Sequence, residues 1–255
     1  MTTELDFRLD DFEPADAVSE LAESSLWAGD LTVLAEHHTT PNGSRSYLVA
    51  HDGSVTWGVP GEPQLVAIEI TRDLSERTFT FEAASHASLA FAQNWLVERG
   101  CPPEPITQVG ADLIQPADDL TVRVEQQVRA SGDRYKVLAT QTSDYAPCET
   151  WTMVRDSGAA QAPIRVFLEE VATDSLTYTV REGTFADEDA ALDWLDNRGD
   201  PLPEPPEYRG DGAALRTRAA LTRSTSPSAI PNAGLDTSTA PSVNIAQRPN
   251  PRRSM

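Results

Sequence analysis

The chain has 255 residues, of which 39% are hydrophobic, and its formal net charge is −20. This length allows one large domain or two small ones, and the apolar fraction is sufficient for a buried core. No apolar run reaches the roughly 18 residues of a membrane-spanning helix, and the acidic N-terminus lacks the features of a secretory signal, so we expect a soluble, cytoplasmic protein with no membrane partner.

The charge is unevenly distributed along the chain. Residues 1–209 hold 14 basic and 38 acidic side chains, a net charge of −24, whereas residues 210–255 hold six Arg and two Asp, a net charge of +4. The acidic body would repel nucleic acid phosphates, so we expect no direct nucleic acid binding and a protein partner with a basic surface. Lys136 is the only lysine against nineteen arginines, a bias that indicates a high-GC bacterial genome.

The N-terminal part of the chain predicts one helix followed by a unit of four strands and a helix. A short helix is expected over 14–26, within an N-terminal segment 1–26. Residues 27–106 are then expected to form four strands followed by an amphipathic helix, and residues 78–81 alternate polar and apolar side chains with period two, as in a half-buried strand. Ser85 is suited to cap the start of this helix, and Gly100 followed by Pro102 to end it. The expected strands lie around 33–35, 47–52, 66–69 and 78–81.

The second half predicts the same order of elements. Residues 107–130 are expected to be a linker and an extra strand over 121–130, and residues 131–208 a second unit whose helix is capped by Thr184. Residues 209–255 are rich in Ser, Thr, Pro and Ala and have few large apolar side chains. Such a composition cannot bury enough surface to offset the entropy of ordering, so we expect a disordered C-terminal tail.

A sequence repeat relates these two units. The string WLVERGCPPEP at 95–105 resembles WLDNRGDPLPEP at 194–205, and a shift of 99 residues places Trp95 and Leu96 on Trp194 and Leu195. These four residues are predicted to form the repeated core between helix and sheet. Further upstream, with small insertions, 47–52 is aligned with 151–156 and 66–69 with 166–169.

The predicted fold class is therefore α+β. It comprises two tandem repeats, each a four-stranded antiparallel sheet followed by one helix packed on it, plus the disordered tail. The two repeats could bury each other's open faces or stand apart as separate domains on a linker, and the sequence leaves both arrangements open.

Chemical motifs are scarce. Phosphate-binding loops, zinc motifs and nucleophile elbows are absent, so no cofactor is expected, and Cys101 and Cys148 are expected to be unpaired. The best cluster of metal-binding residue types is Glu36-His37-His38. On a strand, Glu36 and His38 would face one side and His37 the other, which makes Glu36 and His38 a weak candidate for a catalytic or metal site.

Trp57 is the candidate for contact with a partner. It lies among turn-forming residues in a loop that has no tryptophan in the second repeat. An exposed tryptophan is a frequent anchor in protein interfaces, whereas a buried one would close the core of the first repeat.

These observations favour a non-enzymatic, acidic protein-interaction protein, such as an adaptor, accessory or inhibitor protein. One alternative is a DNA mimic that inhibits a DNA-handling protein, because the acidic body would attract a basic groove. The other is an enzyme with its site between the repeats, where the two copies would have to differ because catalysis needs unlike groups.

Overall fold

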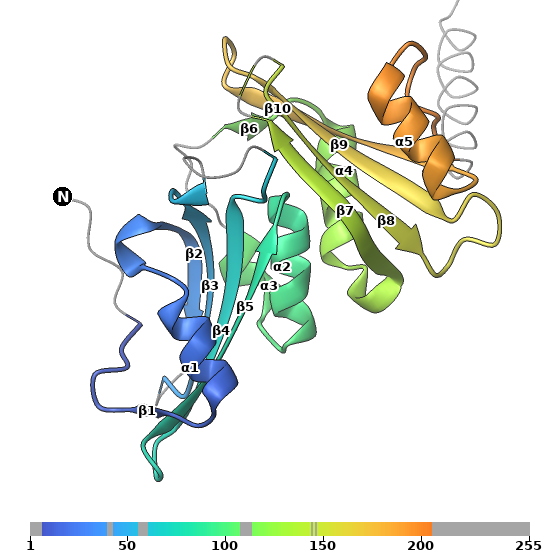
Figure 1. Ribbon diagram of the computed structural model, residues 1–255. Helices are drawn as coiled ribbons and strands as arrows, with labels where there is room; N and C mark the ends of the chain where they lie inside the picture. The colour runs from blue at the N-terminus through green and yellow to red at the C-terminus, as the bar shows by residue number, and fades with distance from the viewer. Residues whose placement is uncertain are drawn as a thin grey trace, which may run out of the picture. The chain divides into compact units, whose positions relative to one another are not determined.

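The computed structural model describes residues 7–39, 43–55, 61–107, 114–143, 145 and 147–205, which all belong to the compact unit Met1–Arg209 (Figure 1). The predicted disordered tail, residues 209–255, lies outside the described residues. Across the described part of the chain, every helix is too short or too polar to cross a lipid bilayer.

The first repeat is a five-stranded sheet with strand order β1-β5-β4-β3-β2. Its long strands are antiparallel, and the two-residue strand β1 pairs in parallel with β5. In chain order the elements are β1 (Glu13–Pro14), α1 (Ala17–Ser24), the 3-10 helix η1 (Ala28–Asp30), β2 (Leu31–His38), β3 (Arg45–Asp52), β4 (Leu65–Asp73), β5 (Thr78–His86) and α2 (Leu89–Glu98).

The second repeat has the same order and pairing, β6-β10-β9-β8-β7, after a short helix α3 (Pro103–Thr107). Its elements are β6 (Gln115–Pro116), α4 (Asp119–Arg129), η3 (Gly132–Arg134), β7 (Tyr135–Ser143), β8 (Glu149–Asp156), β9 (Ile164–Ala172), β10 (Thr177–Phe185) and α5 (Glu188–Asn197).

The predicted α+β class is confirmed, but the repeating unit is larger than expected. Each sheet is mixed and five-stranded rather than four-stranded and antiparallel, because a short strand before the first helix adds to its edge. The repeat therefore begins near residue 13 in the first copy and residue 115 in the second.

The segment 121–130, expected as a strand, is instead part of helix α4. Thr121 to Val124 alternate polar and apolar residues, which suggested a strand. The buried positions Thr121, Val124 and Val128 lie three and four residues apart, so they form one face of a helix. Helix α4 is the counterpart of α1, and together with the short strands it extends the duplication beyond the predicted boundaries.

The same hydrogen bonds start both repeats. Asp16 and Asp118 are the N-cap residues of α1 and α4, and each side chain accepts a hydrogen bond from the backbone N–H three residues later, at 2.7 and 2.8 Å. Those later residues, Ser19 and Thr121, accept in turn from the backbone N–H of Phe81 and Val180, both at 3.2 Å. The short strands β1 and β6 pair only with the first residues of β5 and β10. The helix side chains therefore satisfy the next buried backbone N–H groups along these two strands.

The ends of α2 and α5 differ in detail from the prediction. The N-cap residues are Ser88 and Asp187 rather than Ser85 and Thr184, because strands β5 and β10 continue to the intervening residues. Gly100 follows α2 with φ +91°, as a helix-terminating glycine should. After α5 the left-handed residue is Arg198, with φ +45°, in place of Gly199.

Helices cover both faces of each sheet (Figure 1). In the first repeat, α1 packs with Leu48, Ile68 and Phe81 on one face, whereas α2 packs with Tyr47 and other residues of the opposite face. In the second repeat, α4 and α5 cover the two faces in the same way.

Helix α2 also packs into the core of the second repeat. Phe91 is 5% exposed, and its ring centroid lies 5.4 Å from that of Phe167 on β9. Asn94 exchanges two hydrogen bonds of 3.0 Å with the backbone of Gly132. These contacts favour repeats that pack together over separate domains on a linker.

We expect Thr121→Val to lower the free energy of unfolding by about 1–3 kcal/mol, because the buried N–H of Val180 loses its acceptor. Ser19→Ala should have an effect of the same order in the first repeat. Urea denaturation measures both, and Thr80→Val, at an exposed strand position, serves as the control. An unchanged midpoint for Thr121→Val would show that this bond does not stabilise the fold.

We expect Phe91→Ala to destabilise the protein by about 3–5 kcal/mol, because it opens a cavity in the core of the second repeat. Leu192→Ala is the control, since this α5 side chain is 42% exposed and should matter little. If the repeats fold as one unit, chemical denaturation shows a single transition. Two separated transitions in the wild-type protein would contradict shared packing.

Candidate functional site

Glu36 and His38 lie next to each other on β2. The Nε2 atom of His38 is 3.4 Å from Glu36 Oε2, and its Nδ1 atom is 2.8 Å from Ser46 Oγ. Partial burial, with a further contribution from Arg8, lowers the pKa of His38, so the imidazole is neutral at pH 7. Among the described residues, no cluster of three or more His, Cys, Asp or Glu is arranged to hold a metal.

The other histidines are dispersed. His37 stacks on Tyr47, with ring centroids 6.2 Å apart, on the opposite face of the sheet. His51 lies at the other end of the β2–β3 pair, where its Nε2 atom is 3.3 Å from Gln64 Oε1. His86 ends β5, and burial lowers its pKa to about 4. The structure therefore assembles no histidine-based site from these residues.

Trp57 lies outside the described residues. The repeated tryptophans, Trp95 and Trp194, are partly buried between helix and sheet and have equivalent surroundings. Each contacts the ring of the last residue of the preceding strand, at centroid distances of 6.3 and 6.0 Å, and lies beneath the guanidinium of the arginine four residues later. Leu96 and Leu195 pack into the same clusters as their neighbouring tryptophans.

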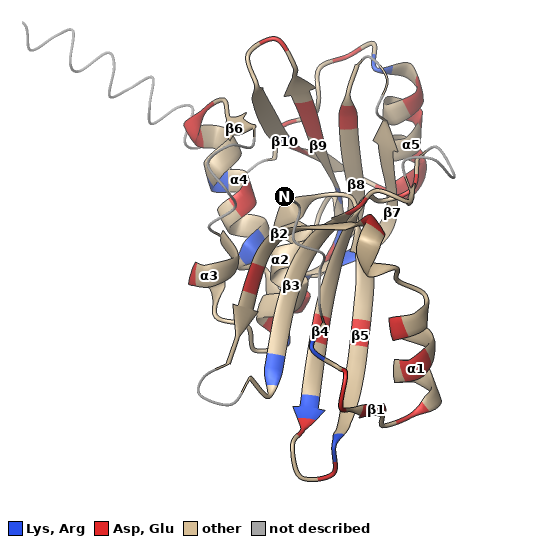
Figure 2. Cartoon of the chain, turned by 90° about the vertical axis from the view of Figure 1, so that its left-hand side faces the viewer, with Lys and Arg blue, Asp and Glu red and all other residues tan. Residues whose placement is uncertain are grey.

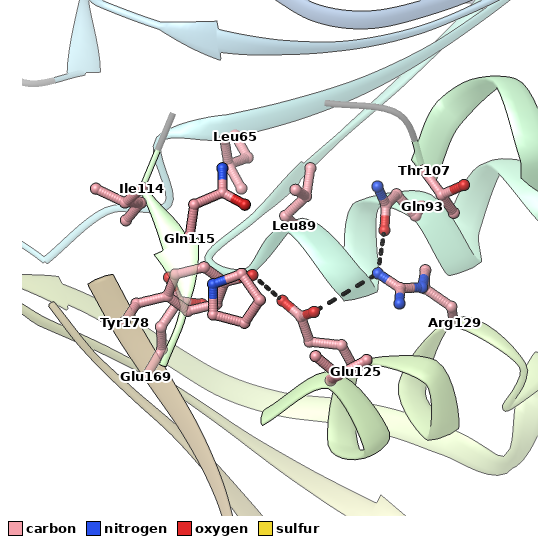
Figure 3. Close-up of a pocket in the computed structure, with 12 residues that line it drawn as sticks. Leu65, Leu89, Gln93, Thr107, Ile114, Gln115, Glu125, Arg129, Glu169 and Tyr178 are labelled. Carbon is pink, nitrogen blue, oxygen red and sulfur yellow. Dashed lines mark hydrogen bonds and ion pairs between the residues drawn. The ribbon is translucent and has the colours of Figure 1, made fainter. Parts of the chain in front are cut away.

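A pocket of about 360 Å³ lies where elements of the two repeats meet (Figure 3). The first repeat contributes residues of β4 and α2, the second contributes residues of β6, α4, β9 and β10, and α3 adds one residue. Much of the lining is apolar, from Leu65, Leu89, Ile114, Pro116 and Val122. This volume is at the lower end of the range for small-molecule sites.

A chain of hydrogen bonds and ion pairs orders one side of the pocket (Figure 3). Tyr178 donates to Glu125 Oε1 at 2.6 Å, and Arg129 Nη1 lies 3.8 Å from Glu125 Oε2. Arg129 also donates to Gln93 Oε1 at 3.3 Å, and Gln93 donates to the carbonyl of Ile106 at 2.7 Å. Burial, reinforced by the bond to Glu125, raises the pKa of Tyr178, so this hydroxyl remains a donor. The chain holds the Glu125 carboxylate in a fixed position.

Glu169, on β9, is the second carboxyl of the pocket. Its side chain lies on the face of the second sheet that α4 covers, where alternate residues such as Phe167 enter the core. Burial, together with the nearby Glu125 carboxylate, raises the pKa of Glu169 to about 7. The group is therefore about half protonated at neutral pH, a property common among functional carboxyl groups.

Glu169 occupies a position that is aliphatic in the first repeat. The pairing of β9 with β10 matches that of β4 with β5 when the copies are shifted by 99 residues, which places Glu169 on Ile70. Ile70 is fully buried. The lining residue Tyr178 likewise replaces Phe79, so these two polar groups of the pocket, Glu169 and the Tyr178 hydroxyl, have no counterpart in the first copy.

The sequence analysis missed Glu169 because its alignment was wrong by one residue. It placed residues 66–69 on 166–169, whereas the strand register requires residues 65–68 to correspond to 164–167. A shift of one residue moves every side chain to the other face of a sheet. With the correct alignment, Glu169 corresponds to Ile70, and a glutamate at a position where the other copy has a buried isoleucine would have indicated a functional residue.

A second difference between the copies lies on α5. The outward stripe of this helix comprises Asp189, Leu192, Asp193 and Asp196, spaced three and four residues apart and all exposed. The corresponding residues of α2 are Ala90, Gln93, Asn94 and Val97, of which the first three are buried at the contact with α4 and η3. The positions that join the two repeats on α2 therefore correspond to positions on α5 that are exposed and mostly acidic.

A third difference is a buried set of charges in the second repeat. Asp156 lies 2.7 Å from Arg134 and 3.0 Å from Arg165, and Arg165 lies 2.9 Å from Glu182. Each carboxylate here has a cationic partner, so we assign the set to the stability of the second sheet rather than to a ligand site.

Comparison of the chain with protein-family models, with curated proteins and with solved structures finds no match. The two regions where the repeats differ and face solvent or a cavity are the pocket and the α5 stripe.

We expect the pH dependence of stability to report the environment of Glu169. Between the ordinary pKa of 4.5 and the folded value of about 7, the native carboxyl holds a proton that the unfolded chain has released. Its contribution to stability is therefore fully present below pH 4.5 and is lost as the pH rises toward 7. Glu169→Gln should make the protein more stable than wild type at pH 8, by on the order of 2 kcal/mol, with little difference at pH 4.5.

Urea denaturation at several pH values measures this effect. Glu170→Gln is the matched control, because Glu170 is the next residue, is exposed and faces away from the pocket. Equal pH profiles for the wild type and Glu169→Gln would contradict a raised pKa at Glu169.

Proposed function

We propose that this protein is a non-enzymatic, acidic interaction protein that binds a basic protein partner through the α5 stripe, defined by Asp189, Leu192, Asp193 and Asp196. The observation that carries the proposal is the equivalence between this exposed stripe and the buried stripe of α2. In the first repeat, the equivalent residues of α2 form an interface with another helix, α4.

The chemistry of the stripe defines the partner. Leu192 is 42% exposed at the centre of the stripe, and carboxylates lie on either side of it. A complementary helix would present an apolar side chain to Leu192 and Arg or Lys side chains around it. The net charge of −24 on residues 1–209 would steer such a partner toward the protein, most strongly at low salt.

Helix stability does not explain these acids. Asp193 and Asp196 lie in the second half of α5, near the negative end of the helix dipole, where a carboxylate is unfavourable. No basic residue occupies the last turn of the helix to offset them. Their placement is consistent with a binding role, and it also keeps the end of the array of repeats soluble.

The DNA-mimic alternative requires a continuous acidic surface that follows a nucleic acid backbone. Acidic residues lie on helices, strands and loops of both repeats (Figure 2). The stripe is one local part of this charge, so a helix-sized partner fits it better than a long groove does.

We expect neutralisation of the stripe to weaken binding to a basic partner by about fivefold or more. The test compares wild type with the triple variant Asp189→Asn, Asp193→Asn, Asp196→Asn in binding a fluorescent, Arg-rich amphipathic helical peptide. Three lost charge contacts correspond to about 1–3 kcal/mol, or roughly 5- to 150-fold in affinity.

The matched control removes the same charge elsewhere, through Glu20→Gln, Glu76→Gln and Glu104→Gln, which are all exposed. This control should change affinity by no more than about threefold. Equal losses in the two triple variants would show attraction by overall charge alone and would refute a specific site on α5.

A further inference from the structure

The pocket contains an ionisable group that the rest of the structure does not use. Within the described part of the chain, the carboxylate of Glu125 is held by Tyr178 and Arg129, but Glu169 has neither a hydrogen bond nor an ion pair. The residue that occupies the same position in the first repeat, Ile70, is apolar. Packing of the sheet therefore does not require a carboxyl at this position.

The surroundings of Glu169 select a particular ligand charge. The lining carries two carboxyls, Glu169 and Glu125, and one cation, Arg129, which already contacts Glu125 and Gln93. An anionic ligand would meet Glu125 and Glu169 without a free cation among the lining residues. A cationic ligand would pair with Glu169 and relieve its repulsion from Glu125.

The remaining lining limits the shape and size of the ligand. Leu65, Leu89, Ile114, Pro116 and Val122 provide apolar surface. One unpaired carboxyl cannot hold a divalent cation, which takes four or more ligands, whereas it can pair with a single ammonium group. A volume of about 360 Å³ accommodates a molecule with a small hydrocarbon or aromatic body and excludes large ligands such as dinucleotides.

We propose that this pocket binds a small organic amine, with its ammonium group paired to Glu169 and its apolar body against the leucine-lined wall from the first repeat. The site is separate from the α5 stripe, so the two proposals can fail independently. Tyr178 faces the same space, and its ring adds an aromatic surface that a cation can approach.

Binding should depend on pH through Glu169. The titratable and charged groups that face it are Glu125 and Arg129 on α4 and Tyr178 on β10. Glu169, whose pKa is raised to about 7 in the free protein, must be ionised to pair with an ammonium group. Affinity should therefore be highest above pH 7 and fall as the pH drops below it, with proton release on binding in that lower range.

The experiment is isothermal titration calorimetry of the full chain at pH 8 with phenethylamine and with hexylamine, each compared with its neutral alcohol analogue. We expect both amines to bind at least about tenfold more tightly than the alcohols. Glu169→Gln should abolish this preference, whereas Glu170→Gln, on the opposite face of the same strand, should retain it. Repetition at pH 5.5 should weaken amine binding to the wild type and leave the variant unchanged.

Two outcomes would overturn the proposal. One is failure of both amines to bind at concentrations up to about 10 mM to protein whose folding is verified by circular dichroism. The other is equal affinity for amine and alcohol, or an amine preference that persists in Glu169→Gln, which would place any binding away from this carboxyl.

Discussion

Helix α2 contributes side chains to the hydrophobic cores of both repeats, and the packing of the two repeats against each other depends on this. Ala92 and Leu96 face the sheet of its own repeat, whereas Ala90 and Phe91 enter the cluster between α4 and the second sheet. A helix with two buried faces cannot be amphipathic in the usual sense, and Gln93 and Asn94 are accordingly buried with hydrogen bonds to partners beyond the helix. Helices α2 and α4 contact each other, and the pocket lies beside this contact, lined also by residues of β6 and β10 (Figure 3).

The two copies share their backbone and differ where they meet each other or solvent. The capping aspartates, the hydroxyls that satisfy the edge strands and the bulges in β2 and β7 recur in both repeats. The face of the first sheet beneath α1 is built on an apolar cluster that includes Leu48, Ile68 and Phe81, whereas the corresponding face of the second sheet holds paired charges and Glu169. On α5, the stripe that corresponds to the junction on α2 carries aspartates and is exposed. The two copies thus share a fold, and the residues that differ between them form the junction, the pocket and the exposed stripe.

Much of this fold could be predicted from the sequence because local signals and the repeat agree. The string around Trp95 and Trp194 marked equivalent helices, period-two alternation located the strands at 78–81 and 177–180, and the alignment of the copies located the other long strands. The segment Thr121–Ala130 was misassigned because four alternating residues imitate a strand, while the helical spacing becomes evident only over two turns. The short parallel strands had no signal of their own, since two residues have no periodicity. The pocket could not be predicted from the sequence for a different reason. Glu169 is one of forty acidic residues, and only the strand register shows that its side chain points into the interior.

The register also explains why a carboxyl at position 169 is informative when other acids are not. Most acids in the described part of the chain lie at exposed positions, where a charge costs little and is by itself weak evidence for a function. At an inward-facing position of a sheet, the ionised form is disfavoured by burial, and here a second carboxylate adds repulsion. The neighbouring charges of the same face, Arg165 and Glu182, offset that cost by pairing with each other, as expected for groups that serve only the fold. Glu169 has no such partner among the described residues and borders a cavity, so its ionised form would be compensated by the ammonium group that we propose as the ligand.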